Sequence, residues 1–269
     1  MSAANASSTP RTAAFPSPWS RADEMRSARR VQTRLFPENA FRRAHLECAG
    51  LCLPCRDVGG DFYDFIDAGP GRVALVLGDV SGKGVPAALM MATLHACLRS
   101  HYALASGDLG RRLESVNRLF LECTAPEHYA SLFVGEYDER SGRLAYANCG
   151  QAPPFVLRRG LRVERLAPTS TVLGMWDGWA CETAQTTLGE GDLILAVSDG
   201  VTDAADPDGE VYGDWRLLTA LTAQRDLRAS VLVRAIADEV RAFCGGDSAD
   251  DVTLVVARAR RPAGADRGR

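Results

Sequence analysis

Short apolar runs typical of β-strands recur along the chain from residue 46 onward. They are bounded by segments that contain Gly, Asp, Asn or Pro, which is the pattern expected of strands and their turns. Eight such runs are enough for two sheets. The predicted strands are Leu46–Leu53, Phe62–Ile66, Val73–Leu77, Tyr129–Tyr137, Leu144–Ala147, Phe155–Leu157, Leu193–Val197 and Val252–Ala257.

Helical patterns occur in pairs between these runs. Val85–Leu104 and Leu109–Cys123 lie between the third and fourth predicted strands, and Trp215–Gln224 and Ala229–Phe243 lie between the last two. The first of these helices is apolar on nearly every side, so we expect it to be well buried. Paired helices between groups of strands predict an α+β sandwich with outer helices, and not an alternating parallel sheet.

The two ends of the chain differ from the middle. Residues 1–20 are rich in Ala, Ser, Thr and Pro, which predicts a disordered leader, and the Arg-rich residues 261–269 predict a basic disordered tail. Residues 21–37 predict an amphipathic linker helix, with an apolar stripe that includes Met25 and Val31. This helix packs on its own domain or forms a dimerising or signal-relaying stalk, and the folded domain is expected at 38–260.

Composition excludes several classes of protein. Among 269 residues, 46% are apolar and the formal net charge is −3. This balance gives no overall basic field, so nucleic acid is not an expected partner. No run reaches the ~18 apolar residues of a membrane helix, and the N-terminus lacks the apolar core of a secretion signal. Eight cysteines in a chain of this length predict free thiols in the cytoplasm, not a disulfide scaffold.

Four acidic clusters lie at strand ends or in Gly-rich turns: Gly59–Asp64, Gly78–Gly84, Ser198–Gly200 and Asp250–Thr253. In the second and third, an apolar strand leads into an Asp followed by a turn. In the fourth, two acids open a strand, which would return the chain to the same end of the sandwich. Carboxylates gathered there repel one another unless a cation neutralises them. The sequence therefore predicts a site for a hard divalent metal.

Oxygen ligands select Mg²⁺ or Mn²⁺ over zinc, and the four histidines show no paired ligand spacing. An isolated Asp beside Gly is usually a turn former or a helix cap. Four clusters in matching contexts favour the metal interpretation.

The motifs DVGGDFYDF (57–65), GDVSGKG (78–84), SDGVTDA (198–204) and DDVTLVVAR (250–258) occur in that order along the chain. Together they resemble the PPM metal-dependent serine/threonine phosphatases, which are protein phosphatase 2C-like. The segment ARRVQTRLFP (28–37) resembles the helix that precedes the catalytic domain in the bacterial RsbU/SpoIIE branch. The resemblance covers about residues 25 to 260.

This resemblance implies a four-layer α-β-β-α sandwich with a central pair of antiparallel β-sheets and two Mn²⁺ or Mg²⁺ ions at one end. Asp79 would bridge both metals, and the backbone carbonyl of Val80 would complete one coordination sphere. Asp199 and Asp250 would hold the second metal, while Asp61 would bind or orient water on the first. Three further acids are weaker metal candidates: Asp251, where many relatives have Asn, and Asp64 and Asp203, with a turn or cap role as the alternative.

The implied activity is hydrolysis of a phosphoserine or phosphothreonine by a bridging metal hydroxide that attacks in line. Eukaryotic members of the family have a His two residues after the bridging Asp, where this chain has Ser81, so we expect water to be the general acid. Arg56 and Lys83 flank the acidic turns and are candidates to bind the substrate phosphate, with solvated surface charge as the alternative.

The branch implies a phosphorylated STAS-domain anti-anti-sigma protein as substrate, and the helix at 21–37 is a candidate homodimer contact. Two other functions stay open. One is a catalytically weak phosphatase-like module that acts by protein binding. The other is an iron–sulfur redox protein, because Cys48, Cys52 and Cys55 have the ligand spacing of radical S-adenosylmethionine enzymes. They fall in an apolar, strand-like run, which favours buried thiols.

Overall fold

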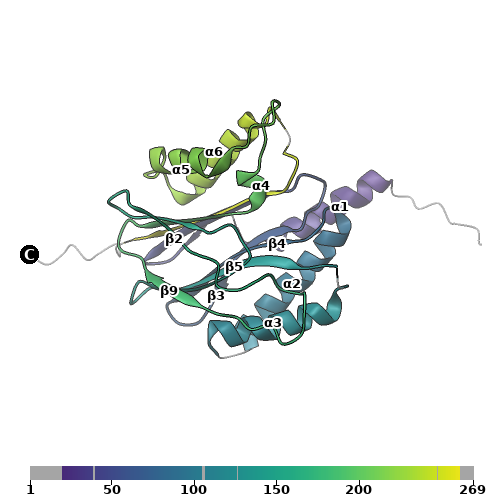
Figure 1. Ribbon diagram of the computed structural model, residues 1–269, viewed down its shortest axis with the longest axis horizontal. Helices are drawn as coiled ribbons and strands as arrows, with labels where there is room; N and C mark the ends of the chain where they lie inside the picture. Colours follow the sequence, from purple (N-terminus) through teal and green to yellow (C-terminus); the bar gives the residue numbers. More distant parts are fainter. Residues whose placement is uncertain (1–19, 39, 105–106, 126, 247, 261–269) are drawn as a thin grey trace, which may run out of the picture.

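The computed structural model describes residues 20–260 except 39, 105–106, 126 and 247. Two antiparallel sheets stack face to face, and helices cover the outer face of each (Figure 1). This is the α+β, four-layer α-β-β-α sandwich that the sequence predicts. The leader expected at 1–20, apart from Ser20, and the tail expected at 261–269 lie outside the described residues.

The first sheet has the strand order β1-β2-β11-β10-β7-β8 and the second the order β3-β4-β5-β6-β9, with every neighbouring pair antiparallel. The strands of the first sheet are β1 (Ala40–Arg42), β2 (Leu46–Leu53), β7 (Phe155–Leu157), β8 (Val163–Arg165), β10 (Leu193–Val197) and β11 (Val252–Ala259). Those of the second are β3 (Asp61–Asp67), β4 (Arg72–Val80), β5 (Ala130–Asp138), β6 (Arg143–Cys149) and β9 (Ala184–Thr187).

Helices α2 (Val85–Leu104) and α3 (Leu109–Cys123) cover the second sheet, while α5 (Gly213–Ala223) and α6 (Ala229–Phe243) cover the first (Figure 1). The pleat sends successive side chains to opposite faces of a strand. In β3, Phe62 therefore packs towards α2 and α3, whereas Tyr63 packs between the two sheets. Apolar residues on both faces of the central strands thus build three stacked layers of core.

The sequence pattern finds eight of the strands and five of the helices but misses β1, β8, β9 and the single-turn helix α4 (Asp199–Thr202). The three missed strands are short, lie at the edges of their sheets and are largely exposed or half-buried. An edge strand buries little of itself, so it leaves no apolar run in the sequence. Apart from the first helix, the predicted bounds of the other elements either match the observed ones or differ from them by at most three residues.

Helix α1 (Arg21–Thr33) is shorter than the predicted helix at 21–37, because its C-cap is Arg34. Ser20 and Asp23 form a capping box at its start. The predicted apolar stripe is wrong at one position: Val31 is 62% exposed and Gln32 is buried in its place. The reason is that the Gln32 amide finds two backbone partners, since its Nε2 donates to the oxygen of Gly59 (2.7 Å) and its Oε1 accepts from the nitrogen of Gly59 (3.2 Å).

A search of the described residues finds no helix with both the length and the apolar character needed to cross a membrane.

Candidate functional site

The acidic residues gather where the ends of four strands meet. Asp61 opens β3 and is the direct register partner of Asp79 on β4. Both side chains lie on the face between the two sheets, because they share the strand phase of Tyr63 and of Leu77, which pack there. Asp79 therefore lies within its strand and not after it, as the sequence pattern suggested.

The first sheet supplies the other acids. Its strand β10 ends at Val197, and Asp199 begins α4 two residues later. The nitrogen of Ser198 donates to the oxygen of Thr253 (3.0 Å), and Ser198 Oγ donates to the oxygen of Asp251 (3.2 Å). These bonds extend the β10–β11 pairing, so that Asp199 lies beside the segment that carries Asp250.

Two glycines allow the backbone to come close at this end. A Cβ on Gly200 would lie 2.1 Å from the oxygen of Asp251, and a Cβ on Gly60 would lie 2.4 Å from the oxygen of Val80. No side chain fits in either place. Gly60 therefore leaves space in front of the Val80 carbonyl, the backbone group predicted to complete a metal site.

Burial and the repulsion between neighbouring carboxylates raise the pKa values of Asp61, Asp79 and Asp199 above the ordinary value. Burial, followed by the charge of Asp79, raises the pKa of Asp61 well above its ordinary value. Burial and the charge of Asp199 raise the pKa of Asp79 to about 6. Burial and the charge of Asp250 also raise the pKa of Asp199. A rise in the pKa of several neighbouring carboxyl groups is expected where carboxylates converge without a cation.

Asp61 carries the clearest sign of a ligand position. Its side chain is 2% exposed, and its Oδ2 is buried with no hydrogen-bond partner in the described part of the chain. A buried, unpaired carboxylate oxygen is costly unless something binds it. The donors around it are carboxylates and backbone carbonyls, which suit Mg²⁺ or Mn²⁺. The residues present therefore fit a hard metal ion.

Asp251 holds the loop before β3. Its Oδ1 accepts a hydrogen bond from the nitrogen of Cys55 (2.8 Å), and its Oδ2 accepts from the nitrogens of Gly60 (3.0 Å) and Asp61 (3.4 Å). Both oxygens are thus engaged by backbone N–H groups. This geometry favours a positioning role for Asp251 over direct metal binding.

The two candidate phosphate-binding residues differ in surroundings. Lys83 Nζ donates to Asp250 Oδ2 (2.7 Å) and to the oxygen of Ala249 (2.8 Å), and the bond to Asp250 raises the pKa of Lys83. Arg56 lies exposed near Gly84, at the start of α2. Phosphate binding by either residue stays a prediction.

We call Asp61, Asp79, Asp199 and Asp250 the acidic centre. Asp64, one of the weaker metal candidates, lies away from this centre, and its candidate role as a metal ligand is wrong. It is hydrogen-bonded to His95 Nε2 (2.8 Å) and to both Nε (2.6 Å) and Nη2 (2.9 Å) of Arg99. Being three residues after Asp61, it lies on the opposite face of β3 and anchors α2. The single sequence could not fix the strand phase on which this distinction depends.

Asp203 and Ser81 border the centre. Asp203 is exposed, accepts a hydrogen bond from Thr202 Oγ1 (3.3 Å), and contributes its charge to the raised pKa of Asp199. Ser81 Oγ accepts from the nitrogen of Tyr129 (3.0 Å) just before β5. The Ser81 side chain thus fixes the start of that strand.

Sequence reasoning did not place two residues in this region: Gln32, and Cys55, which it considered only as an iron–sulfur ligand. A glutamine beside an apolar stripe gave only a weak signal for Gln32. One ligand atom each of Cys55, Asp250 and Asp251 lie within 4.8 Å of one another. Burial, with the hydrogen bond and charge of Asp251, raises the pKa of the Cys55 thiol to about 11, so it stays protonated at neutral pH.

The iron–sulfur alternative is wrong. Cys48 and Cys52 are both in β2, four residues apart, which places them about 13 Å from each other at ~3.3 Å per residue. Cys55 lies in the loop beyond the strand. Three sulfurs in this arrangement do not converge on one cluster.

Comparison with known proteins places these observations in a family. The family model described as "Stage II sporulation protein E (SpoIIE)" matches residues 69–260. Protein IcfG of Synechocystis sp. is 28% identical over 258 residues, which is 86% of this chain and 41% of IcfG. Phosphoserine phosphatase RsbU of Bacillus subtilis is 24% identical over 236 residues, which is 87% of this chain and 70% of RsbU. The chain thus spans less than half the length of the first of these relatives.

The fold agrees with a solved structure. The SiaA-PP2C domain of Pseudomonas aeruginosa superposes with a TM-score of 0.75 at 21% sequence identity, covering 88% of this chain and 96% of that domain. The family match extends over most of the described sandwich, including the segments that carry Asp79, Asp199 and Asp250. The chain belongs to the SpoIIE family, the RsbU/SpoIIE branch of the PPM phosphoprotein phosphatases.

Proposed function

We propose that this chain hydrolyses phosphoserine or phosphothreonine in a protein, with two Mn²⁺ or Mg²⁺ ions held at the acidic end of the sandwich. The observation that carries the proposal is the convergence of Asp61, Asp79, Asp199 and Asp250 from four separate segments, with shared repulsion and one orphaned buried oxygen. Residues 38–260 form the proposed catalytic domain.

The proposed ligands divide between the two sheets. Asp79 is the register partner of Asp61, and the charge of Asp199 contributes to the raised pKa of Asp79; both observations support Asp79 as the residue that would contact both ions. Asp61 and the Val80 carbonyl would serve the first ion, and Asp199 and Asp250 the second. When bound, the ions would activate water and neutralise charge on the phosphoryl oxygens.

The remaining residues shape this end of the molecule. Asp251 fixes the Cys55–Asp61 segment through three backbone N–H groups. Lys83 offsets the charge of Asp250. Arg56 is exposed, and the planar donors of its guanidinium group suit a phosphate dianion, which supports it as the proposed phosphate-binding residue.

The finer assignments follow from the branch. A phosphorylated STAS-domain protein is the proposed substrate, supported by the similarity to RsbU. Dimerisation through α1 is supported by the exposure of Val31 on that helix. A cytoplasmic location is supported by the eight cysteines, which all carry free thiols.

The test is release of p-nitrophenol from p-nitrophenyl phosphate, and of phosphate from a phosphoserine peptide, with Mn²⁺ or with EDTA. We expect activity with Mn²⁺ alone, and a loss of about 10³-fold in Asp79→Asn, since metal ions supply several kcal/mol at ~1.4 kcal/mol per decade.

Asp203→Asn is the matched control, because it removes the same charge from an exposed residue beside the centre. It should retain most activity. A folded wild-type protein that takes up Mn²⁺ but hydrolyses neither substrate would instead support the alternative of a binding module.

A further inference from the structure

Two of the free cysteines, Cys149 and Cys181, lie against each other in the fold. Cys149 ends β6 and is fully buried, whereas Cys181 is half-buried in the irregular segment between β8 and β9. Both side chains pack in the core layer between the second sheet and helices α2 and α3. The thiol of Cys149 donates a hydrogen bond to the sulfur of Cys181. Two segments that are separate along the chain thus meet sulfur to sulfur.

Backbone contacts hold the two cysteines in this arrangement. Ser170 forms a parallel β-bridge with Cys149, and Ser170 Oγ accepts a hydrogen bond from the nitrogen of Glu182 (2.8 Å). The nitrogen of Cys181 donates to Glu114 Oε1 on α3 (3.3 Å). The segment around Cys181 is therefore bonded both to the neighbour of β6 and to the helix above it. The contact between the sulfurs does not depend on the thiols alone.

The two thiols differ in acidity. The hydrogen bond from Cys149 lowers the pKa of Cys181, and a hydrogen bond from the Ser170 side chain lowers it further. Donating the same bond, together with burial, raises the pKa of Cys149. The thiolate is the form of cysteine that reacts with peroxides, and it reacts fastest where an oxidant can reach it. Cys181 is thus the sulfur that an oxidant attacks first.

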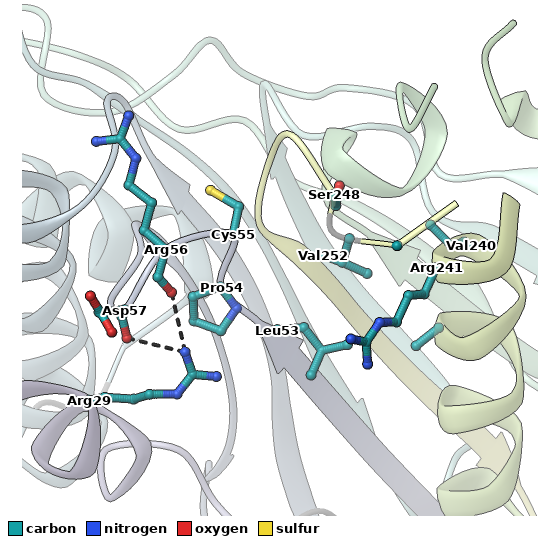
Figure 2. A pocket seen from close by; sticks show the side chains of 12 residues that line it. Arg29, Leu53, Pro54, Cys55, Arg56, Asp57, Val240, Arg241, Ser248 and Val252 are labelled. Atoms are coloured by element: carbon teal, nitrogen blue, oxygen red, sulfur yellow. Dashed lines mark hydrogen bonds between the residues drawn. The ribbon is translucent and has the colours of Figure 1, made fainter. Parts of the chain in front are cut away.

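Burial has the opposite effect on other cysteines of the chain. Cys55 is half-buried and lines a cavity of about 460 Å³ between α1 and α6 (Figure 2). Its pKa is nevertheless raised to about 11, by burial and by Asp251, so its thiol stays protonated at neutral pH. Burial also raises the pKa values of Cys48, Cys52, Cys97 and Cys244. Access alone therefore does not single out a reactive cysteine, whereas acidity and a neighbouring thiol single out Cys181.

We propose that Cys149 and Cys181 form a reversible disulfide when the protein meets a peroxide. The Cys181 thiolate attacks one peroxide oxygen, the O–O bond breaks, and the other oxygen leaves as hydroxide and takes up a proton to give water. Cys181 is then a sulfenic acid. The sulfur of Cys149 attacks the sulfur of Cys181, and the hydroxyl group leaves as water with the proton of the Cys149 thiol. The peroxide gains the two electrons that the two thiols lose.

The disulfide would close a loop that reaches the strand beside the acidic centre. Leu173, inside this loop, exchanges two backbone hydrogen bonds with Ala130 (3.0 and 2.8 Å), and Ala130 is the register partner of Val80. A cross-link across about 30 residues removes enough freedom from the unfolded chain to raise its Tm measurably. Oxidation would therefore restrain the segment that borders the start of β5.

The experiment treats the reduced, metal-free full chain with a small molar excess of hydrogen peroxide and then alkylates the remaining thiols in denaturant. We expect non-reducing peptide mapping by mass spectrometry to recover the Cys149 and Cys181 peptides linked, and lighter by two hydrogens than their sum. The Cys55 peptide should be alkylated. The Tm should rise by about 5 °C or more, and dithiothreitol should reverse both changes. No step requires turnover, so the result is independent of the proposed phosphatase function.

Three variants separate this pair from the other thiols. Cys181→Ser should lose both the cross-link and the rise in Tm, while Cys244→Ser, which removes another half-buried thiol, should keep both. In Cys149→Ala, Cys181 should stop at the sulfenic acid and be labelled by dimedone. If Cys149→Ala does not fold, Cys181→Ser still decides. Full alkylation of Cys149 and Cys181 in peroxide-treated wild type, oxidation of Cys55 before Cys181, or a rise in Tm that persists in Cys181→Ser would overturn the proposal.

Discussion

At the scale of single residues, the repulsion among the buried carboxylates of the acidic centre lowers the stability of the fold, and a bound cation would relieve it. Burial and the charge of Asp199 raise the pKa of Asp79 to about 6, above its ordinary value of 3.8. The folded protein then binds protons more tightly than the unfolded chain between these values. Without metal, the contribution of Asp79 to stability is greatest below pH 4 and is lost as the pH rises through 6.

This linkage predicts that stabilisation by Mn²⁺ grows with pH. Metal binding requires the ionised carboxylates, so protons compete with it near pH 5. At a hundredfold excess over Kd, Mn²⁺ should stabilise by about 2.7 kcal/mol, or ~5–10 °C in Tm, at pH 7 and by much less at pH 5. Differential scanning fluorimetry with Mn²⁺ or EDTA measures this. Equal shifts at both pH values would contradict it.

The residue scale also shows what a sequence can and cannot determine. Asp61, Asp79, Asp199 and Asp250 could be chosen because each stands in a motif next to glycine or at a strand end. Asp64 could be ranked below them but not excluded, because its separation from the centre depends on strand phase. The raised pKa values and the orphaned oxygen of Asp61 depend on three-dimensional burial, which no local pattern contains.

At the scale of elements, two contacts fix helices to the strands that carry the site. Asp64 on β3 is fully buried and accepts hydrogen bonds from His95 and Arg99 of α2. Gln32 of α1 makes two hydrogen bonds with Gly59, two residues before Asp61. The first contact lies on the outer face of the sheet and the second at its acidic end.

Asp64→Asn should therefore destabilise the fold without altering the site. Removing the charge of the buried Asp64 leaves the Arg99 guanidinium without its anionic partner, and this costs about 3–5 kcal/mol where both members of a pair are fully buried. Because the Arg99 side chain is 51% exposed, screening reduces the expected loss to about 2 kcal/mol. Urea unfolding measures it. Asp67→Asn, at the exposed end of β3, is the control, and an equal loss there would refute the anchor.

Gln32→Ala should weaken Mn²⁺ binding more than it lowers the stability of the fold. It removes both hydrogen bonds to Gly59 and leaves a buried backbone pair unsatisfied, a cost of about 1–3 kcal/mol on the segment that places Asp61. We expect the Mn²⁺ concentration for half-maximal p-nitrophenyl phosphate hydrolysis to rise about tenfold. Thr33→Ala, which alters an exposed hydroxyl bonded within α1, should leave it unchanged. An unchanged Mn²⁺ requirement in Gln32→Ala would show that this contact does not position Asp61.

The sequence predicted the long apolar helices and strands well and the short edge strands poorly. Long apolar segments such as Val85–Leu104 and Leu46–Leu53 were placed to the residue, because a continuous apolar run marks an element clearly. The expectation that the helix Val85–Leu104 is well buried is wrong, since Val85, Leu89 and Leu104 are exposed. The edge strands β1, β8 and β9 leave no such pattern. In α1 the exposed Val31 and the buried Gln32 reverse the expected polarity, because hydrogen-bond partners and not hydropathy determine which of them is buried.

At the scale of the whole molecule, the centre joins the two sheets. Asp61 and Asp79 come from the second sheet, and Asp199 and Asp250 from the ends of the first. The β10–β11 pairing and the β3–β4 pairing bring together residues that lie far apart along the chain. Ions bound there would link the two layers as well as the residues, so site assembly and sandwich packing depend on each other.

The most direct test of this account is isothermal titration calorimetry of the metal-free protein with Mn²⁺ at pH 7. It predicts two ions per chain for wild type, reduced uptake in Asp79→Asn, and wild-type uptake in Asp203→Asn. Absence of Mn²⁺ binding to folded wild type, or full uptake in Asp79→Asn, would contradict the assignment of the acidic end as a two-metal centre.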